Sequence, residues 1–167
     1  MPEPTLDDDV MDIFEEFKKG LANELEEDDF ETHYNLGIAY KEMGLVDDAI
    51  KEFQISRNDS KRFVQSSTML GVCYVEKSLY SLAIETLQNI MSSITQEDES
   101  YWPVKYDLAA AYEKNGQLEE ALSLYTEVYG WNAGFRNVSS RINDIKTRLG
   151  EQDEKKPKEK KNRVSYL

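Results

Sequence analysis

The sequence that decides the fold begins with Leu36-Gly37-x-x-Tyr40, which is followed nine residues later by Ala49 and then by Phe53. The pattern recurs twice downstream, as Leu70-Gly71-x-x-Tyr74 with Ala83 and Leu87, and as Leu108-Ala109-x-x-Tyr112 with Ala121 and Tyr125. The copies start 34 and 38 residues apart, and the polar stretch 92–100 can hold the extra residues as a longer loop. Self-similarity at such a period is typical of repeat architectures.

Each copy predicts a helical hairpin. Leucine, a small residue and tyrosine at this spacing share one face of a first helix. The small residue there, and the alanine nine residues after the tyrosine, let the two helices approach closely. Gly44 and Gly116 lie where the first helix must end and the chain must turn. Ser78 stands at that place in the second copy, so we expect its turn to be less ideal.

The triplicated pattern resembles the tetratricopeptide-repeat (TPR) family over about residues 30–134. The resemblance implies an all-α fold, a right-handed α-α superhelix of three hairpins at about 30–63, 64–101 and 102–134. Two family features are missing: the aromatic residue before the leucine is replaced by His33, Ser67 and Lys105, and no proline closes each repeat. The predicted repeat core consists of Leu36, Gly37, Tyr40, Ala49, Phe53, Leu70, Gly71, Tyr74, Ala83, Leu87, Leu108, Ala109, Tyr112, Ala121 and Tyr125.

The segments on either side of the repeats predict capping helices. Apolar residues from Leu6 to Leu25 recur at helical spacing, so residues 1–29 are expected to hold an amphipathic capping or docking helix. The stripe Val138, Ile142, Ile145 and Leu149 predicts a second capping helix within 135–150 that ends at Gly150. Residues 151–167 are rich in lysine up to Arg163, and we expect a disordered tail.

Composition and motifs point away from catalysis. The formal net charge of −13 makes nucleic acid a poor partner. One histidine and one cysteine cannot build a His/Cys metal site, and the acidic clusters lack the spacing of a calcium loop. Phosphate-binding and catalytic motifs are missing as well. We therefore expect no enzyme, cofactor or metal. Cys73 is expected to be a small buried residue, and His33 to fill the place of the missing aromatic.

In the TPR family the first helices line a concave groove, which gives the candidate partner-binding residues. They are Tyr34, Ile38 and Lys41 in the first repeat, Thr68, Val72 and Val75 in the second, and Tyr106, Ala110 and Glu113 in the third. This apolar floor with an acidic rim suits an amphipathic helix or an extended apolar segment carrying Lys or Arg. The clamp that holds the carboxylate of heat-shock chaperones is missing, because its places hold Tyr34, Ile38, Met69, Pro103 and Asp107. The N-terminal helix is an alternative occupant of the groove.

A narrower resemblance rests on Phe14-x-x-Phe17-Lys18-Lys19-Gly20, on Phe135-Arg136-x-Val138 and on the ending Val164-Ser165-Tyr166-Leu167. These segments look like a C-terminal TPR module of scaffold proteins in deltaproteobacteria and relatives. The resemblance implies a bacterial scaffold or adaptor in an assembly, motility or polarity complex. It also leaves open whether Met1 is the native start. The alternative is a TPR-class chaperone for secreted apolar substrates, of the type III secretion kind.

Further expectations concern location, the tail and assembly. A cleavable signal and an apolar run of about 18 residues are both missing, which favours the cytoplasm. The basic tail can act through charge, on an acidic partner or an anionic membrane surface, or through a recognition peptide formed by Val164, Ser165, Tyr166 and Leu167. The oligomeric state is open, including dimerisation through the N-terminal helix.

Overall fold

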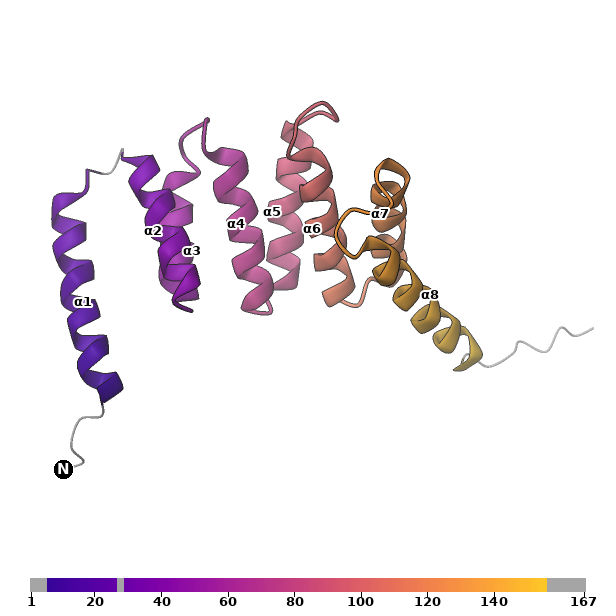
Figure 1. Ribbon diagram of the computed structural model, residues 1–167, viewed down its shortest axis with the longest axis horizontal. Helices are drawn as coiled ribbons and strands as arrows, with labels where there is room; N and C mark the ends of the chain where they lie inside the picture. Colours follow the sequence, from indigo (N-terminus) through magenta and orange to yellow (C-terminus); the bar gives the residue numbers. More distant parts are fainter. Residues whose placement is uncertain (1–5, 27–28, 156–167) are drawn as a thin grey trace, which may run out of the picture. The chain divides into compact units, whose positions relative to one another are not determined.

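The computed structural model describes residues 6–26 and 29–155. Over these residues the chain forms eight α-helices and no strand, as predicted (Figure 1). The helices are α1 (Leu6–Glu24), α2 (Phe30–Glu42), α3 (Val46–Ser56), α4 (Phe63–Glu76), α5 (Tyr80–Ser93), α6 (Tyr101–Lys114), α7 (Leu118–Trp131) and α8 (Val138–Lys155). The chain divides into two compact units, Met1–Phe63 and Val64–Leu167, at the start of α4.

In the first unit α2 and α3 form a hairpin. The Asp29 carboxylate caps α2 by accepting a hydrogen bond from the Thr32 backbone N–H at 3.2 Å. Gly44 then turns the chain with a left-handed φ of 79°. The close approach at Gly37 is real, because a Cβ there would lie 2.6 Å from the Phe53 ring. The small residue of the first repeat therefore sets the distance between α2 and α3.

Helix α1 lies against the side of this hairpin that carries Tyr40. The rings of Phe14 and Tyr40 meet edge to face with centroids 5.7 Å apart, and Lys18 Nζ donates to Asp48 Oδ1 at 3.0 Å. Tyr34, Ile38 and Lys41 lie on another face of α2 by helix geometry. The N-terminal helix is thus formed as predicted, and it packs away from the candidate binding residues of its own unit.

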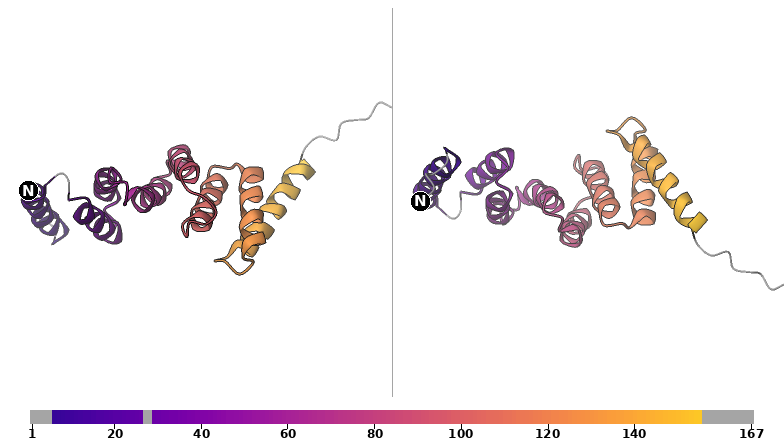
Figure 2. Two further views of the ribbon diagram at one scale, coloured as in Figure 1. Left: turned by 90° about the horizontal axis from the view of Figure 1, so that it is seen from above. Right: turned by 90° about the horizontal axis from the view of Figure 1, so that it is seen from below.

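The second unit contains the α4–α5 and α6–α7 hairpins and α8. A Cβ at Gly71 would lie 2.7 Å from the Leu87 side chain, so the second hairpin is built like the first. Its turn has Ser78 at φ 60°, the left-handed conformation that Gly116 adopts in the third hairpin at φ 81°. The expectation of a less ideal turn at Ser78 is therefore confirmed. Both views of Figure 2 show α8 beside the α6–α7 hairpin.

The repeat residues form the core. Of the predicted repeat-core residues, all but Leu36 and Tyr112 are buried; these two are half-buried. Val138, Ile142 and Ile145 of α8 join the core of the third hairpin, which confirms the capping stripe. Helix α8 runs beyond its predicted end at Gly150, to Lys155. The reason is that Gly150 does not adopt the left-handed conformation with which glycine ends a helix.

Candidate partner-binding surfaces

The α4 strip, formed by Thr68, Val72 and Val75, is an apolar surface of the second unit. All three side chains are half-buried. The Thr68 hydroxyl donates to the backbone carbonyl of Val64 at 2.7 Å, so it is bonded within the helix. Glu76 is the one charged residue of α4, in a chain of which 32% is charged. The strip therefore offers a partner an apolar contact.

The candidate residues of the first unit are partly engaged already. Tyr34, Ile38 and Lys41 are half-buried on α2. The Tyr34 ring lies 5.8 Å from the Phe53 ring, centroid to centroid, and the Arg62 guanidinium lies over the Tyr34 ring, 5.2 Å from its centroid. A partner that contacts Tyr34 would therefore meet a ring that already has two neighbours within the first unit.

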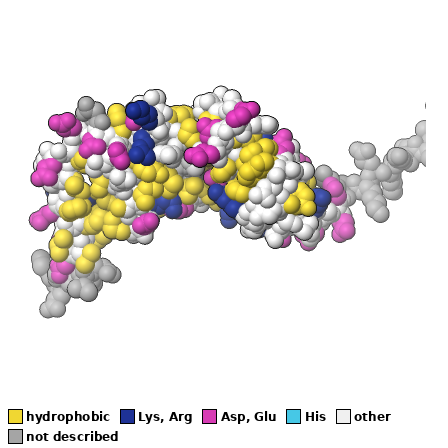
Figure 3. Space-filling view, turned by 45° about the horizontal axis from the view of Figure 1, so that its top comes forward, with side chains coloured by type: hydrophobic (Ala, Val, Ile, Leu, Met, Phe, Trp, Pro, Cys, Tyr) yellow, Lys and Arg dark blue, Asp and Glu magenta, His cyan; other side chains and the backbone are white. Residues whose placement is uncertain are grey.

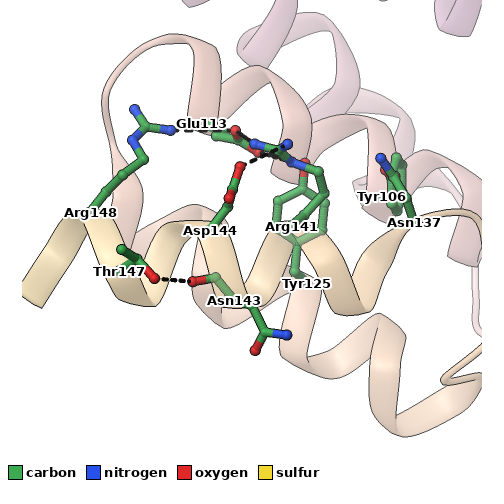
Figure 4. A network of polar contacts seen from close by, with 9 residues as sticks. All are labelled: Tyr106, Glu113, Tyr125, Asn137, Arg141, Asn143, Asp144, Thr147 and Arg148. Atoms are coloured by element: carbon green, nitrogen blue, oxygen red, sulfur yellow. Dashed lines mark hydrogen bonds and ion pairs between the residues drawn. The ribbon is translucent and has the colours of Figure 1, made fainter.

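The third repeat directs two of its candidate residues towards the segment around α8. Tyr106 is buried, and its hydroxyl donates to the Asn137 side chain. Ala110 packs against the core of the hairpin. The Glu113 carboxylate, which is 10% exposed, accepts hydrogen bonds from Tyr125 and Arg141 and pairs with Arg148 at 3.4 Å (Figure 4). The polar groups of Tyr106 and Glu113 are thus bound within the chain.

This polar network has a defined protonation pattern. Burial, and then the charge of Glu113, raise the pKa of Tyr125, so its hydroxyl remains a donor. The hydrogen bonds to Glu113 raise the pKa of Arg141, whose charge they stabilise. Burial raises the pKa of Asp107, and the Arg136 guanidinium 2.8 Å away opposes this shift. The network therefore combines a carboxylate with two cations and a neutral tyrosine, and it fastens α8 to the third hairpin.

An aromatic cluster lies where α6 begins and α7 ends. The Trp102 and Trp131 rings stack with centroids 5.2 Å apart, and Tyr101 meets Trp102 edge to face at 5.0 Å. These contacts make Trp102 a packing residue of the third hairpin. Lys105, in place of the family's aromatic, donates to Glu127 at 2.8 Å and to Tyr101 at 3.0 Å. Burial alone would lower the pKa of Lys105, but these hydrogen bonds outweigh it and raise the pKa.

The sequence did not predict a groove in the first unit, between α1 and the α2–α3 hairpin. Its volume is about 1060 Å³, and Leu21, Leu25, Leu36 and Ile55 contribute apolar lining. His33 also lines it and is buried, with Nδ1 2.5 Å from Glu52 Oε2. His33, expected in the place of the missing aromatic residue, is thus a buried side chain, and Cys73 is completely buried, as predicted.

Two further findings concern the described part of the chain only. Within it, no cluster of three or more His, Cys, Asp or Glu side chains is placed to hold a metal ion. Nor does any helix described there combine the length and the apolar character that crossing a membrane requires. The tail peptide Val164, Ser165, Tyr166 and Leu167 lies outside the described residues.

Comparison with known proteins finds one tetratricopeptide repeat in the sequence and the TPR fold in solved structures. The family model described as "Tetratricopeptide repeat" matches residues 106–131, within α6 and α7. No curated protein sequence matches the chain. A crystal structure of MamA superposes with a TM-score of 0.68 at 23% identity, over 83% of this chain and 77% of that one.

Two other solved structures share the fold. The first TPR of Spaghetti (RPAP3), bound to the HSP90 peptide SRMEEVD, gives a TM-score of 0.65 at 17% identity, over 75% of this chain and 99% of that one. A putative kinesin light chain of Podospora anserina, with nearly identical TPR-like repeats, gives 0.63 at 20% identity, over 87% and 80%. Likenesses at these identities show the fold alone. Together with the matched repeat in α6 and α7, they show that the chain has the all-α fold of tetratricopeptide-repeat proteins.

Proposed function

We propose that this chain is a non-enzymatic scaffold or adaptor, and that it binds a segment of a partner protein on the α4 strip. The observation that carries the proposal is the chemistry of α4. Thr68, Val72 and Val75 are apolar or bonded within the helix, and they are half-buried on a helix with a single charged residue. In a chain that is otherwise strongly charged, such a strip supports protein binding rather than a role as solvated surface.

The partner segment should be apolar and basic. The Spaghetti TPR holds an HSP90 peptide that contains two glutamates and an aspartate. The present chain carries a formal charge of −13, and Tyr34, Ile38 and Met69 stand where the chaperone clamp needs cations or amides. An acidic peptide would be repelled by this surface. An amphipathic helix, or an extended apolar segment with Lys or Arg at its edges, complements it instead.

The setting of this interaction is proposed from the narrower sequence resemblance. A bacterial assembly, motility or polarity complex in the cytoplasm would need such an adaptor. In the same proposal the tail residues Val164 to Leu167 form a second, peptide-like contact. Removing residues 156–167 would then weaken one interaction without altering the affinity of the α4 strip.

The test compares two variants of the full chain. Val72→Glu places a carboxylate in the strip, whereas Leu82→Glu places one at an exposed leucine of α5, which is 41% exposed. Each variant serves as bait for proteins of the native host, and affinities for captured partners are measured by titration calorimetry. We expect Val72→Glu to weaken binding roughly tenfold or more and Leu82→Glu to leave it nearly unchanged. Equal affinities for wild type and a folded Val72→Glu protein would refute the site.

A further inference from the structure

Helix α1 presents an apolar face that stays exposed among the residues 6–26 and 29–155 that the structure describes. Val10 is 56% exposed, Ile13 69% and Phe17 56%. Their spacing of three and four residues places them on one side of the helix, and we call them the outer strip. Figure 3 shows hydrophobic side chains gathered over α1 at the left end of this face. Exposing three large hydrophobic side chains on one helix face is costly unless something covers them.

The rest of α1 is held by contacts within the first unit. Phe14 packs on Tyr40, and Lys18 bridges Glu15 at 2.7 Å and Asp48 at 3.0 Å. Leu21 and Leu25 line the groove beside the α2–α3 hairpin. Helix α1 is therefore fastened along one side, and the outer strip lies on the side next to it by helix geometry.

The charges beside the outer strip are acidic. Asp9 and Glu16 are seven residues apart, so they lie in line along its free border, and both are exposed. Lys18 is engaged by Glu15 and Asp48 on the inner side. Lys19 lies on the side of α1 opposite the strip by helix geometry. An occupant of the strip therefore meets an apolar centre and a negative edge.

We infer that the outer strip docks an amphipathic helix of a partner protein, with Lys or Arg flanking its apolar face. The helix α1 spans 19 residues, roughly 28 Å at 1.5 Å per residue, which is enough for an extended helix–helix contact. Basic flanks on the partner would pair with Asp9 and Glu16, and its apolar face would cover Ile13 and Phe17. This surface is distinct from the α4 strip and is tested by its own variants.

The acidic border argues against two other occupants. A second copy would bring its own Asp9 and Glu16 against the first pair, in a chain whose net charge is already −13. An anionic membrane would be repelled by the same carboxylates.

The probe is a synthetic amphipathic helical peptide of leucine and lysine, labelled with fluorescein. A peptide with the same leucines and glutamate in place of lysine serves as the control. Binding to the full chain is followed by fluorescence anisotropy at about 0.15 M salt, where screening beyond about 8 Å suppresses unspecific attraction. We expect the lysine peptide to bind, and the glutamate peptide to bind at least about tenfold more weakly.

Three variants locate the contact. We expect the double variant Ile13→Glu with Phe17→Glu to bind the lysine peptide roughly tenfold or more weakly than wild type. Leu79→Glu with Leu82→Glu changes two exposed leucines of the second unit, 47% and 41% exposed, and should change binding less than about twofold. Asp9→Asn with Glu16→Gln leaves the apolar strip intact and should weaken binding and reduce its salt dependence. This last variant keeps the inference testable if the glutamates disturb α1.

Other results would overturn the inference. One is an equal loss of peptide binding in the outer-strip variant (Ile13→Glu with Phe17→Glu) and in the leucine variant (Leu79→Glu with Leu82→Glu). Another is that Val72→Glu loses peptide binding while the variant Ile13→Glu with Phe17→Glu retains it. This result would place the peptide on the α4 strip. A dimer in sedimentation that dissociates when Ile13 and Phe17 are changed would identify a second copy as the occupant. Strip-dependent binding to phosphatidylglycerol vesicles would identify a membrane.

Discussion

Replacing Gly37 by alanine should destabilise the first hairpin, although alanine is the better helix former. A Cβ at Gly37 would lie 2.6 to 2.8 Å from three atoms of the Phe53 ring. Carbon atoms in good contact are about 3.5–4.0 Å apart. The ring cannot bend away as an alkyl chain can, and Phe53 is completely buried. Either the ring leaves its rotamer or α2 and α3 move apart.

The magnitude follows from two opposing effects. Overpacking a well-packed core costs about 1–3 kcal/mol, and a rigid ring in a fully buried place favours the upper end. Alanine in place of glycine in a helix interior stabilises the helix by about 1 kcal/mol. The net loss in the free energy of unfolding is then about 2 kcal/mol. For a chain of 167 residues, this corresponds to a fall in Tm of roughly 4–8 °C.

Gly20→Ala is the matched control. Gly20 lies inside α1, in the same unit, and a Cβ there would meet no atom within 4 Å. Only the gain in helix propensity remains, so stability should stay equal or rise by up to about 1 kcal/mol. Thermal and urea unfolding by circular dichroism measure both variants. A Gly37→Ala protein as stable as wild type would show that α2 and α3 are not held at the distance that this reasoning requires.

Three further changes test other parts of the fold. Ser78→Gly should stabilise the protein by about 0.5–1 kcal/mol, because it relieves a left-handed residue; a lower urea midpoint would contradict this. Ala83→Arg should cost about 3–5 kcal/mol, since Ala83 is fully buried and the cation would be unpaired; a melting temperature within a degree or two of wild type would refute the assigned register. Glu113→Gln should cost roughly 1–3 kcal/mol, because Arg141 and Arg148 lose the Glu113 carboxylate and Arg141 keeps only Asp144 as a charged partner; hydrogen exchange should then rise first in α8, and unchanged exchange there would count against the network.

The fold could be predicted because its close contacts leave a signature in the sequence. Gly37 and Ala49 are small since α2 and α3 approach closely, and Ser78 was recognisable because glycine stands at the same place in the other two hairpins. The prediction that helix α8 ends at Gly150 was wrong for a related reason. Glycine permits a left-handed turn without requiring one, and Gly150 remains in the helix.

Burial of the repeat positions could be predicted less completely, because it depends on the neighbouring element. Leu36 occupies a core position of the repeat, but its neighbour is α1, which leaves the groove of about 1060 Å³ open beside it. Tyr112 is half-buried, and its hydroxyl accepts a hydrogen bond from the Gln88 amide. The repeat pattern alone does not encode how well each neighbour covers the hairpin.

The candidate site shows the same limit more sharply. Glu113 has the position of a groove residue in its repeat, and nothing nearby in sequence marks it as a structural anchor. Its partners Arg141 and Arg148 are 28 and 35 residues away, seven apart on one face of α8. That spacing is the one signal which could have pointed to the pair. The Glu113 carboxylate of the third repeat holds α8 and is therefore not available to a partner. The proposed contacts with partners lie instead on the α4 strip and on the outer strip of α1, and variants of Val72 and Phe17 separate these two surfaces.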